Sequence, residues 1–190
     1  MKRLIIGISG ASGAIYGVRL LLALHNVTEV ETHLVISNAA RQTLALETSL
    51  SLREVQALAD VVHDARDIAA SISSGSFKTL GMVILPCSIK TLSGIVNSYS
   101  DGLLIRAADV TLKERRPLVL CVRETPLHLG HLRLMIQAAE MGVVIMPPVS
   151  AFYHLPKSVD DIIDQTVNRV IDQFDIALPV DLFTRWQDPN

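Results

Sequence analysis

The segment GISGASGAIYG, residues 7–17, carries glycines at 7, 10 and 13 and serines at 9 and 12, directly after the apolar run Leu4-Ile5-Ile6. A strand that turns through small residues into a helix leaves backbone N–H groups free for an anion, and the two hydroxyls add donors. The spacing matches neither the dinucleotide pattern G-x-G-x-x-G nor a P-loop, which ends in G-K-[ST]. The segment predicts either a site for the phosphate of a mononucleotide or a tight turn with a serine cap.

Polar side chains also follow other apolar runs, where further strands are predicted to end. Ser37-Asn38 follows residues 30–36, Cys87-Ser88-Ile89-Lys90-Thr91 follows 81–86, and Arg123-Glu124-Thr125 follows 117–122. Ligands of parallel α/β sheets bind outside the carboxyl ends of the strands, so these residues are expected to share one site. Helix caps explain the serines singly, whereas a charged pair straight after PLVLCV needs a partner at the sheet edge. Together the loops favour a phosphorylated cofactor.

The elements that position these residues alternate between short apolar runs and longer helical patterns, which is typical of a parallel sheet covered on both faces. The predicted strands are 3–8, 30–36, 81–86, 117–122 and 142–146, and the predicted helices are 14–25, 38–47, 52–59, 88–98, 103–114, 128–141 and 158–174. Residues 71–80 read as an extended loop. The predicted fold class is α/β, with a doubly wound, flavodoxin-like or Rossmann-like parallel sheet in one domain over 1–190 and a C-terminal tail from about residue 178.

Composition narrows the class of protein. Hydrophobic residues make up 49% of the 190 residues and charged residues 19%, which is more apolar surface than a monomer of this size usually hides. We therefore expect a homo-oligomer. The net charge of -2 and the absence of a basic run argue against nucleic acid as a partner. No apolar segment approaches the roughly 18 residues of a membrane span.

The N-terminus and the two cysteines indicate a reducing compartment. The apolar run after Met1 resembles a leader peptide, but Gly7, Ser9 and Gly10 interrupt it, so it is better interpreted as a buried first strand. Cys87 and Cys121 lie at or near the ends of apolar runs, where reduced, packed thiols are expected. The predicted location is cytoplasmic.

Cysteine nucleophile and metal chemistry are both poorly supported. A phosphatase loop of the form C-x5-R needs an arginine six residues after Cys87, and that residue is Ser93. The six histidines are scattered, and His128 and His131 have no acidic or cysteine ligands beside them. A surface helix N-terminus is the expected setting for this pair, and no metal is predicted.

Four ordered segments resemble the UbiX-type flavin prenyltransferases. They are GISGASGAIYG, GMVILPCSIKTLSGI (81–95), RAADVTLKERRPLVLCVRETPL (106–127), and MPPVSAFYHLP (146–156) followed by VNRVIDQF (167–174). The resemblance implies transfer of a dimethylallyl group from dimethylallyl monophosphate to reduced FMN, which builds a fourth ring on the isoalloxazine. It further implies that a UbiD-type decarboxylase, including that of ubiquinone biosynthesis, receives the product. A dodecamer built from trimers, with sites where subunits meet, is also implied.

The same resemblance assigns roles to individual residues. The flavin ligands it implies are Gly10, Ala11, Ser12, Ser37, Ser88, Ile89, Lys90, Thr91 and Arg123. Tyr153 and Arg169 match ligands of the donor phosphate, and Lys113 matches a lysine of the same anion site. Glu47 and Glu124 match acidic residues near the flavin and the isoprenoid. Arg106 falls in a segment near a subunit boundary, and Arg185-Trp186 match a C-terminal RW.

Four of these residues also have ordinary structural explanations, which the sequence leaves open. Lys113, with Arg115 and Arg116, can end a solvated helix, Tyr153 can pack beside Phe152, Glu47 can cap an exposed helix, and Arg169 can pair with Asp172 or Gln165.

The residue types suit the chemistry that the resemblance implies. Displacing phosphate from an allylic carbon builds negative charge on the leaving group, which Lys113, Arg123, Arg169 and Tyr153 can stabilise. In the family the flavin N5 attacks and a second bond forms at C6, so a ring proton must leave. Glu47, Glu124 or the released phosphate can carry it. The DDxxD metal pattern is absent, because Asp160-Asp161 lead into IIDQ, and this fits a metal-independent reaction of a monophosphate.

Two alternatives remain open from the sequence. An FMN-dependent cysteine decarboxylase would share the fold, but it would carry a PASANT-like loop and a catalytic histidine, whereas this chain reads PCSIKT. A non-catalytic flavin carrier would need no donor-phosphate residues.

Overall fold

The computed structural model describes residues 1–186. It has a six-stranded, all-parallel sheet in the order β3-β2-β1-β4-β5-β6. The strands are β1 (Lys2–Ile8), β2 (Val30–Ile36), β3 (Val61–His63), β4 (Gly81–Cys87), β5 (Leu118–Val122) and β6 (Val144–Ile145). This is the Rossmann order, in which the chain reverses its direction of winding between β1 and β4. The predicted doubly wound sheet is confirmed, with the edge strand β3 as an addition.

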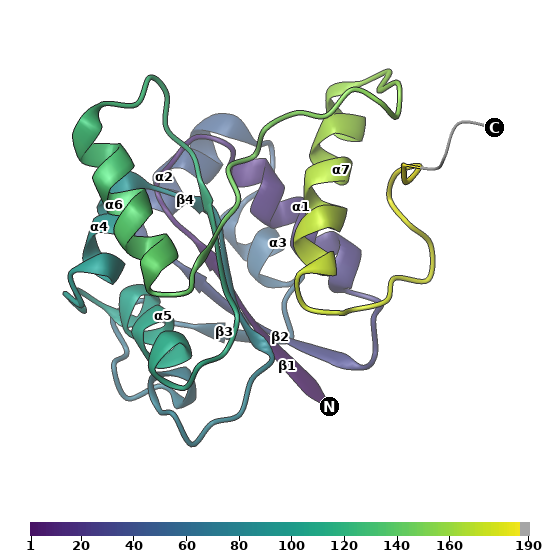
Figure 1. Ribbon diagram of the computed structural model, residues 1–190. Coiled ribbons are helices and arrows are strands. Elements are labelled where there is room, and N and C mark those ends of the chain that lie inside the picture. Colours follow the sequence, from purple (N-terminus) through teal and green to yellow (C-terminus); the bar gives the residue numbers. More distant parts are fainter. Residues whose placement is uncertain (187–190) are drawn as a thin grey trace.

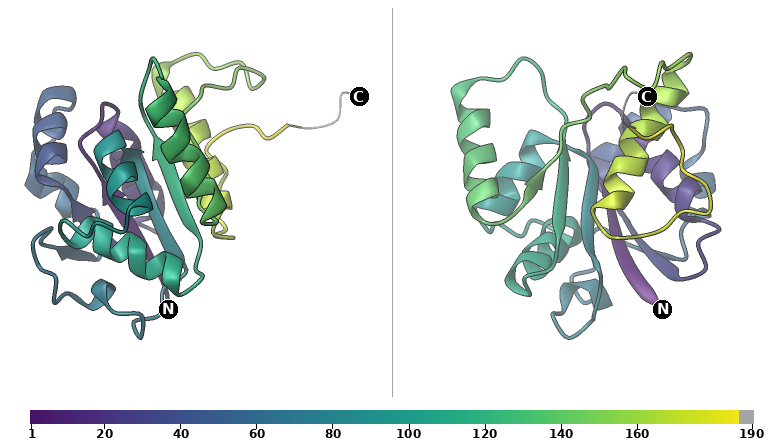
Figure 2. Two further views of the ribbon diagram at one scale, coloured as in Figure 1. Left: turned by 60° about the vertical axis from the view of Figure 1, so that its left-hand side comes forward. Right: turned by 45° about the vertical axis from the view of Figure 1, so that its right-hand side comes forward.

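Helices cover both faces of the sheet (Figures 1 and 2). They are α1 (Ala14–Leu24), α2 (Asn38–Glu47), α3 (Leu52–Gln56), α4 (Ile89–Val96), α5 (Leu103–Lys113), α6 (Leu129–Glu140) and α7 (Val159–Asp172). All seven correspond to predicted helices. The segment predicted as an extended loop contains one 3-10 turn at Ser71–Ser73.

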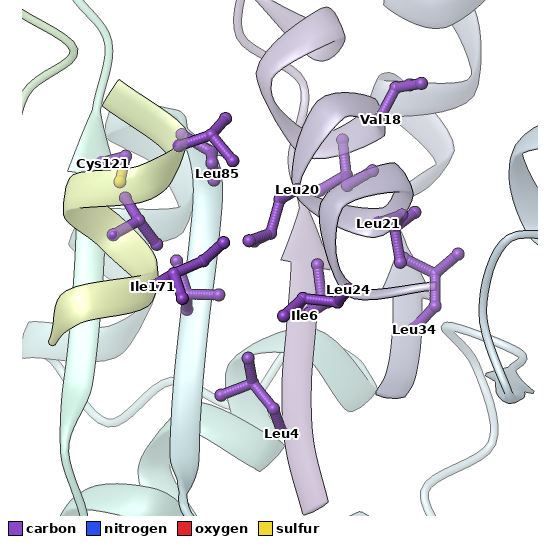
Figure 3. Close-up of a cluster of buried hydrophobic side chains, with 14 of the residues drawn as sticks. Leu4, Ile6, Val18, Leu20, Leu21, Leu24, Leu34, Leu85, Cys121 and Ile171 are labelled. Carbon is purple, nitrogen blue, oxygen red and sulfur yellow. The ribbon is translucent and has the colours of Figure 1, made fainter. Parts of the chain in front are cut away.

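The core lies in two layers because successive residues of the central strands point to opposite faces. Leu4 and Ile6 of β1 pack with Leu20 and Leu24 of α1 on one face, where Ile171 of α7 also lies (Figure 3). Ile5, between them in sequence, packs on the other face among residues of α4, α5 and α6. Each fully buried leucine or isoleucine contributes about 1.5 to 3 kcal/mol. This two-sided burial explains why the strands are almost continuously apolar.

The turn between β1 and α1 requires glycine at two positions. Gly13 has φ 96°, in the left-handed region that favours glycine. A Cβ at Gly10 would lie 2.3 Å from the side chain of Ala39 in α2, so only glycine allows this approach. The glycine spacing thus positions the β1 turn against the first turn of α2.

Both cysteines are buried free thiols, as predicted. Burial raises the pKa of Cys121 to about 12 and raises the pKa of Cys87 above its ordinary value. Neither thiol is therefore available as a thiolate nucleophile. Among residues 1–186, no helix is long and apolar enough to cross a membrane.

Candidate functional site

A cavity of about 260 Å³ opens where β1, β2 and β4 end. Its lining includes five of the residues that the sequence assigned to the flavin: Gly10, Ser37, Ser88, Lys90 and Thr91. The cavity lies at the point between β1 and β4 where the winding reverses, which is the usual ligand position in such sheets. The fold therefore brings residues from three separate loops to one place.

Of the helices that begin at this cavity, α2 and α4 each begin with a serine cap. The Ser37 Oγ accepts a hydrogen bond from the Ala40 amide at 3.1 Å, and the Ser88 Oγ accepts one from the Thr91 amide at 3.3 Å. Among residues 1–186, the first two amides of α4, those of Ile89 and Lys90, have no hydrogen-bond acceptor. The positive ends of two helix dipoles and these amides make the cavity suitable for a phosphate.

Ser9 connects the turns after β1 and β4. Its Oγ donates to the Pro86 carbonyl at 2.9 Å and accepts from the Ser88 amide at 2.8 Å, and the side chain is fully buried. The expectation that Ser9 offers its hydroxyl to an anion is therefore wrong, because that hydroxyl already has a protein acceptor. Ser9 instead fixes Ser88 relative to Gly10.

Glu47, the last residue of α2, caps the N-terminus of α1. Its Oε2 accepts hydrogen bonds from the amides of Gly13 at 2.7 Å and Ala14 at 3.1 Å. Partial burial raises the pKa of Glu47, but hydrogen bonds from Ser12, Gly13 and Ala14 and the charge of Arg123 outweigh it, so the pKa lies below its ordinary value. The first amides of α1, expected to be free for an anion, thus already bind a carboxylate.

Arg123, just after β5, lies near this cap. Its charge lowers the pKa of Glu47 and opposes the rise that burial causes in the pKa of Tyr16. Tyr16, in the first turn of α1, was not predicted; an aromatic residue right after the glycine turn was its only sequence signal. Glu124 is exposed, and its carboxylate accepts from the Thr125 amide at 3.0 Å.

The sequence predicts that the pair Arg123-Glu124 has a partner at the sheet edge. Both residues are exposed, and neither forms an ion pair with any residue in the range 1–186. The chain leaves the sheet at this point, and the predicted partner stays a prediction that a bound ligand can meet.

The residues assigned to the donor phosphate lie on a different surface. The guanidinium of Arg169 on α7 pairs with Asp172 at 2.9 Å, and Arg185 pairs with the same carboxylate at 2.9 Å. The Tyr153 ring packs edge-on against Phe183, with centroids 6.4 Å apart. We call this region, defined by these five residues, the α7–tail surface.

The direction of α7 separates Arg169 from the cavity. Phe174, just past the end of α7, packs against Gly81, the first residue of β4, so this end of the helix lies at the amino edge of the sheet. Arg169 is ten residues beyond Val159, or about 15 Å along the helix. A single chain does not place Arg169 beside the loops after the strands.

Lys113 also lies at the amino edge of the sheet. It is the last residue of α5, and its Nζ pairs with Glu114 at 2.6 Å. Pro117, four residues later, accepts a hydrogen bond from Met82 at the start of β4. The cavity is at the opposite edge, and the single chain therefore leaves Lys113 apart from Arg123.

His128 and His131 have the setting predicted for them. His128 caps α6, because its Nδ1 accepts from the Gly130 amide at 3.0 Å, and the two rings lie 3.5 Å apart. Over residues 1–186, no three histidine, cysteine or acidic side chains are grouped so that they can hold a metal ion.

Comparison with known proteins gives concordant findings. The flavoprotein family model matches residues 1–171. The chain is 83% identical over 187 residues to flavin prenyltransferase UbiX of Escherichia coli K12, covering 98% of this chain and 99% of the relative. The crystal structure of AnUbiX (PadA1) in complex with FMN and dimethylallyl pyrophosphate superimposes with a TM-score of 0.94 at 47% identity, covering 100% of this chain and 99% of that one. A dodecameric FMN-dependent UbiX-like decarboxylase from Escherichia coli O157:H7 also gives 0.94, at 53% identity, covering 98% and 100%.

Proposed function

Since the chain belongs to the flavin prenyltransferases of UbiX type, we infer that it transfers a dimethylallyl group to reduced FMN. The observation that carries this function is the cavity at the carboxyl edge of the sheet, which Gly10, Ser37 and Ser88 line. The fold around it matches that of the UbiX structure in complex with FMN. We propose dimethylallyl monophosphate as the donor, because the sequence lacks the DDxxD pattern that holds metal ions on a diphosphate.

The residues at the cavity fit the phosphate end of FMN. Gly10 lines the cavity where its turn packs closely against Ala39, and α4 offers the amides of Ile89 and Lys90. Ser37 and Ser88 would orient these helix ends, and Ala11 and Ser12 would border the flavin on the α1 side. Arg123 and Tyr16 then stand where the ring would extend. When bound, reduced FMN supplies the nucleophilic ring nitrogen.

The two glutamates of the site have different roles. Glu47 is held ionised by two amides, so its carboxylate is a weak base and keeps the turn in place. Glu124 is exposed and has only the amide of its neighbour as a donor, which leaves oxygen lone pairs free. We therefore assign the proton released on ring closure to Glu124 and the positioning of the flavin turn to Glu47.

A second copy of the chain would complete the site. The cavity of about 260 Å³ is below the roughly 300–1,000 Å³ of ligand pockets, so it suits only part of the flavin. Tyr153, Arg169 and Lys113 offer a phenol and two cations on other surfaces, where an adjacent copy can bring them to the donor phosphate. Exposed apolar side chains can form the contacts between copies, among them Leu129, Leu132, Ile136, Val149, Phe152 and Leu155. We propose a homo-oligomer, with the dodecamer of the relative as the expected form.

Neither alternative function is favoured. A cysteine decarboxylase needs a catalytic histidine, and among residues 1–186 no histidine lines the cavity. His128 and His131 stack on each other at the start of α6. A non-catalytic flavin carrier binds no donor phosphate and so would not need the cationic side chains of the α7–tail surface. The product would pass to a UbiD-type decarboxylase, and the free thiols Cys87 and Cys121 support a cytoplasmic location.

The test is anaerobic incubation of the protein with reduced FMN and dimethylallyl monophosphate, followed by mass measurement of the flavin. We expect the flavin to gain one five-carbon unit. Folded protein that binds FMN and leaves its mass unchanged would contradict the transferase function. Release of carbon dioxide from a peptidyl cysteine in a parallel reaction would favour the decarboxylase.

A further inference from the structure

One wall of the cavity comes from a segment that neither the sequence motifs nor the family resemblance assigns to the site. Ala65 and Arg66, directly after the edge strand β3, line the cavity together with Lys90 and Asp101. Two cationic side chains therefore border the same space as the free amides of α4. Lys90 belongs to the expected flavin ligands, whereas Arg66 does not.

A backbone hydrogen bond fastens this segment to α5, while the arginine head group is exposed. The Ala65 carbonyl accepts from the Leu103 amide at 2.8 Å, which fastens the segment to the first residue of α5. Among residues 1–186, the Arg66 guanidinium pairs only with its near neighbour Asp64, with Nη2 to Oδ2 at 2.9 Å, and its side chain is 82% exposed. Exposed ion pairs of this kind are weak, so a stronger anion can displace the carboxylate.

Lys90, which also lines the cavity, has a similar arrangement. Its Nζ lies 3.8 Å from Asp101, and its side chain is 86% exposed. Each cation at the rim is therefore held by one aspartate near the cavity. A phosphate monoester carries about -1.5 to -2 charges at neutral pH and three acceptor oxygens, more than a single carboxylate offers.

We propose that Arg66 is a second cationic ligand of the FMN phosphate, in addition to Lys90, and that it exchanges Asp64 for the phosphate when FMN binds. The planar guanidinium suits two parallel hydrogen bonds to phosphate oxygens, which an ammonium group does not provide. This assignment rests on the proposed function. It makes Arg66 a determinant of selectivity for FMN over riboflavin, which has the same ring and no phosphate.

The experiment measures the dissociation constants of FMN and riboflavin for the whole protein and for Arg66→Ala, Arg66→Lys and the control Arg53→Ala. Arg53 is an exposed arginine on α3 that does not line the cavity, so its loss changes net charge equally. We expect Arg66→Ala to weaken FMN roughly tenfold, with riboflavin and the control unchanged. Arg66→Lys should weaken FMN less, and the salt dependence of FMN binding should be shallower in Arg66→Ala.

Two results would overturn the assignment. One is an FMN affinity of Arg66→Ala within twofold of the unaltered protein. The other is an equal loss of FMN and riboflavin affinity, which would mean that Arg66 only supports the loop. Absence of FMN binding by the unaltered protein would instead refute the proposed function, so the two failures are distinguishable.

Discussion

Replacing Glu47 by alanine tests whether this carboxylate holds the glycine turn in place. The change removes the acceptor of two hydrogen bonds, from Gly13 at 2.7 Å and Ala14 at 3.1 Å, at the positive end of α1. Loss of an N-terminal cap costs about 0.5–2 kcal/mol, and loss of a charge at a helix N-terminus about 0.3–1 kcal/mol. Because Glu47 is exposed, we expect the lower part of this range, about 1 kcal/mol.

The assay is thermal unfolding at fixed protein concentration, since an oligomer melts at a concentration-dependent temperature. For a chain of this length, about 1 kcal/mol corresponds to a decrease in Tm of roughly 2–4 °C. The pKa of Glu47 lies below its ordinary value, so its contribution is fully present above that value of 4.5 and is lost as pH falls through the lowered pKa. The difference between Glu47→Ala and the unaltered protein should therefore vanish in acid.

The matched control is Glu29→Ala, at an exposed glutamate between α1 and β2, which should leave Tm unchanged. If Glu47→Ala also leaves Tm unchanged near neutral pH while prenyl transfer is lost, the capping role is refuted and Glu47 acts only in the chemistry. A lowered Tm with transfer reduced in proportion to weaker FMN binding supports the positioning role.

Three further predictions concern the division of the site and the response to acid. Arg169→Ala should keep FMN bound and lower prenyl transfer about ten- to a hundredfold, measured as flavin mass in a single turnover, whereas Ser12→Ala should also weaken FMN retention. If Arg169→Ala loses the flavin but transfers fully when FMN is in excess, Arg169 belongs to the cofactor site. Lys113→Ala and Arg123→Ala should each be inactive in prenyl transfer. Oligomers co-assembled from both variants should regain activity, because some sites then combine an intact Lys113 with an intact Arg123. Mixed oligomers that stay inactive would show that Lys113 acts in its own chain. Burial and the charge of His33 lower the pKa of His63 from its ordinary value of 6.5, so the contribution of neutral His63 to stability is present above pH 6.5 and is lost as pH falls through the lowered pKa. The Tm of His63→Gln should therefore depend less on pH between pH 7 and 5. An unchanged pH dependence of Tm would contradict this.

The sequence predicted the central sheet well because its strands are buried on both faces. The apolar run of β4 lies between a predicted loop and a helical pattern, and Ser88 after it caps the next helix. The edge strand β3 was missed because three residues are too few to show a period. That omission also hid Arg66, since a residue is only assigned to the carboxyl edge once a strand is placed before it.

The missed contacts at the site share a physical cause: they join residues far apart in the chain. Glu47 caps a helix that begins 33 residues earlier, so no local pattern distinguishes it from an ordinary helix end. Ser9 gives its hydroxyl to a carbonyl 77 residues away, and nothing near it in the sequence marks it as buried. Spacing reveals which residues can cap or bind, but tertiary pairing decides which donors remain for a ligand.

The separation of the two predicted anion sites follows from the direction of the helices. In a parallel sheet each crossover helix starts near the carboxyl edge and returns to the amino edge, so the last turns of α5 and α7 lie far from the ligand position. Lys113 and Arg169 occupy those last turns, and repacking a loop cannot move them across the sheet. We propose that another copy of the chain presents their cationic groups to the donor phosphate beside Arg123, so that assembly is a condition of the chemistry. Dissociation into folded monomers should therefore abolish transfer while the phosphate end of FMN still binds at the α4 amides.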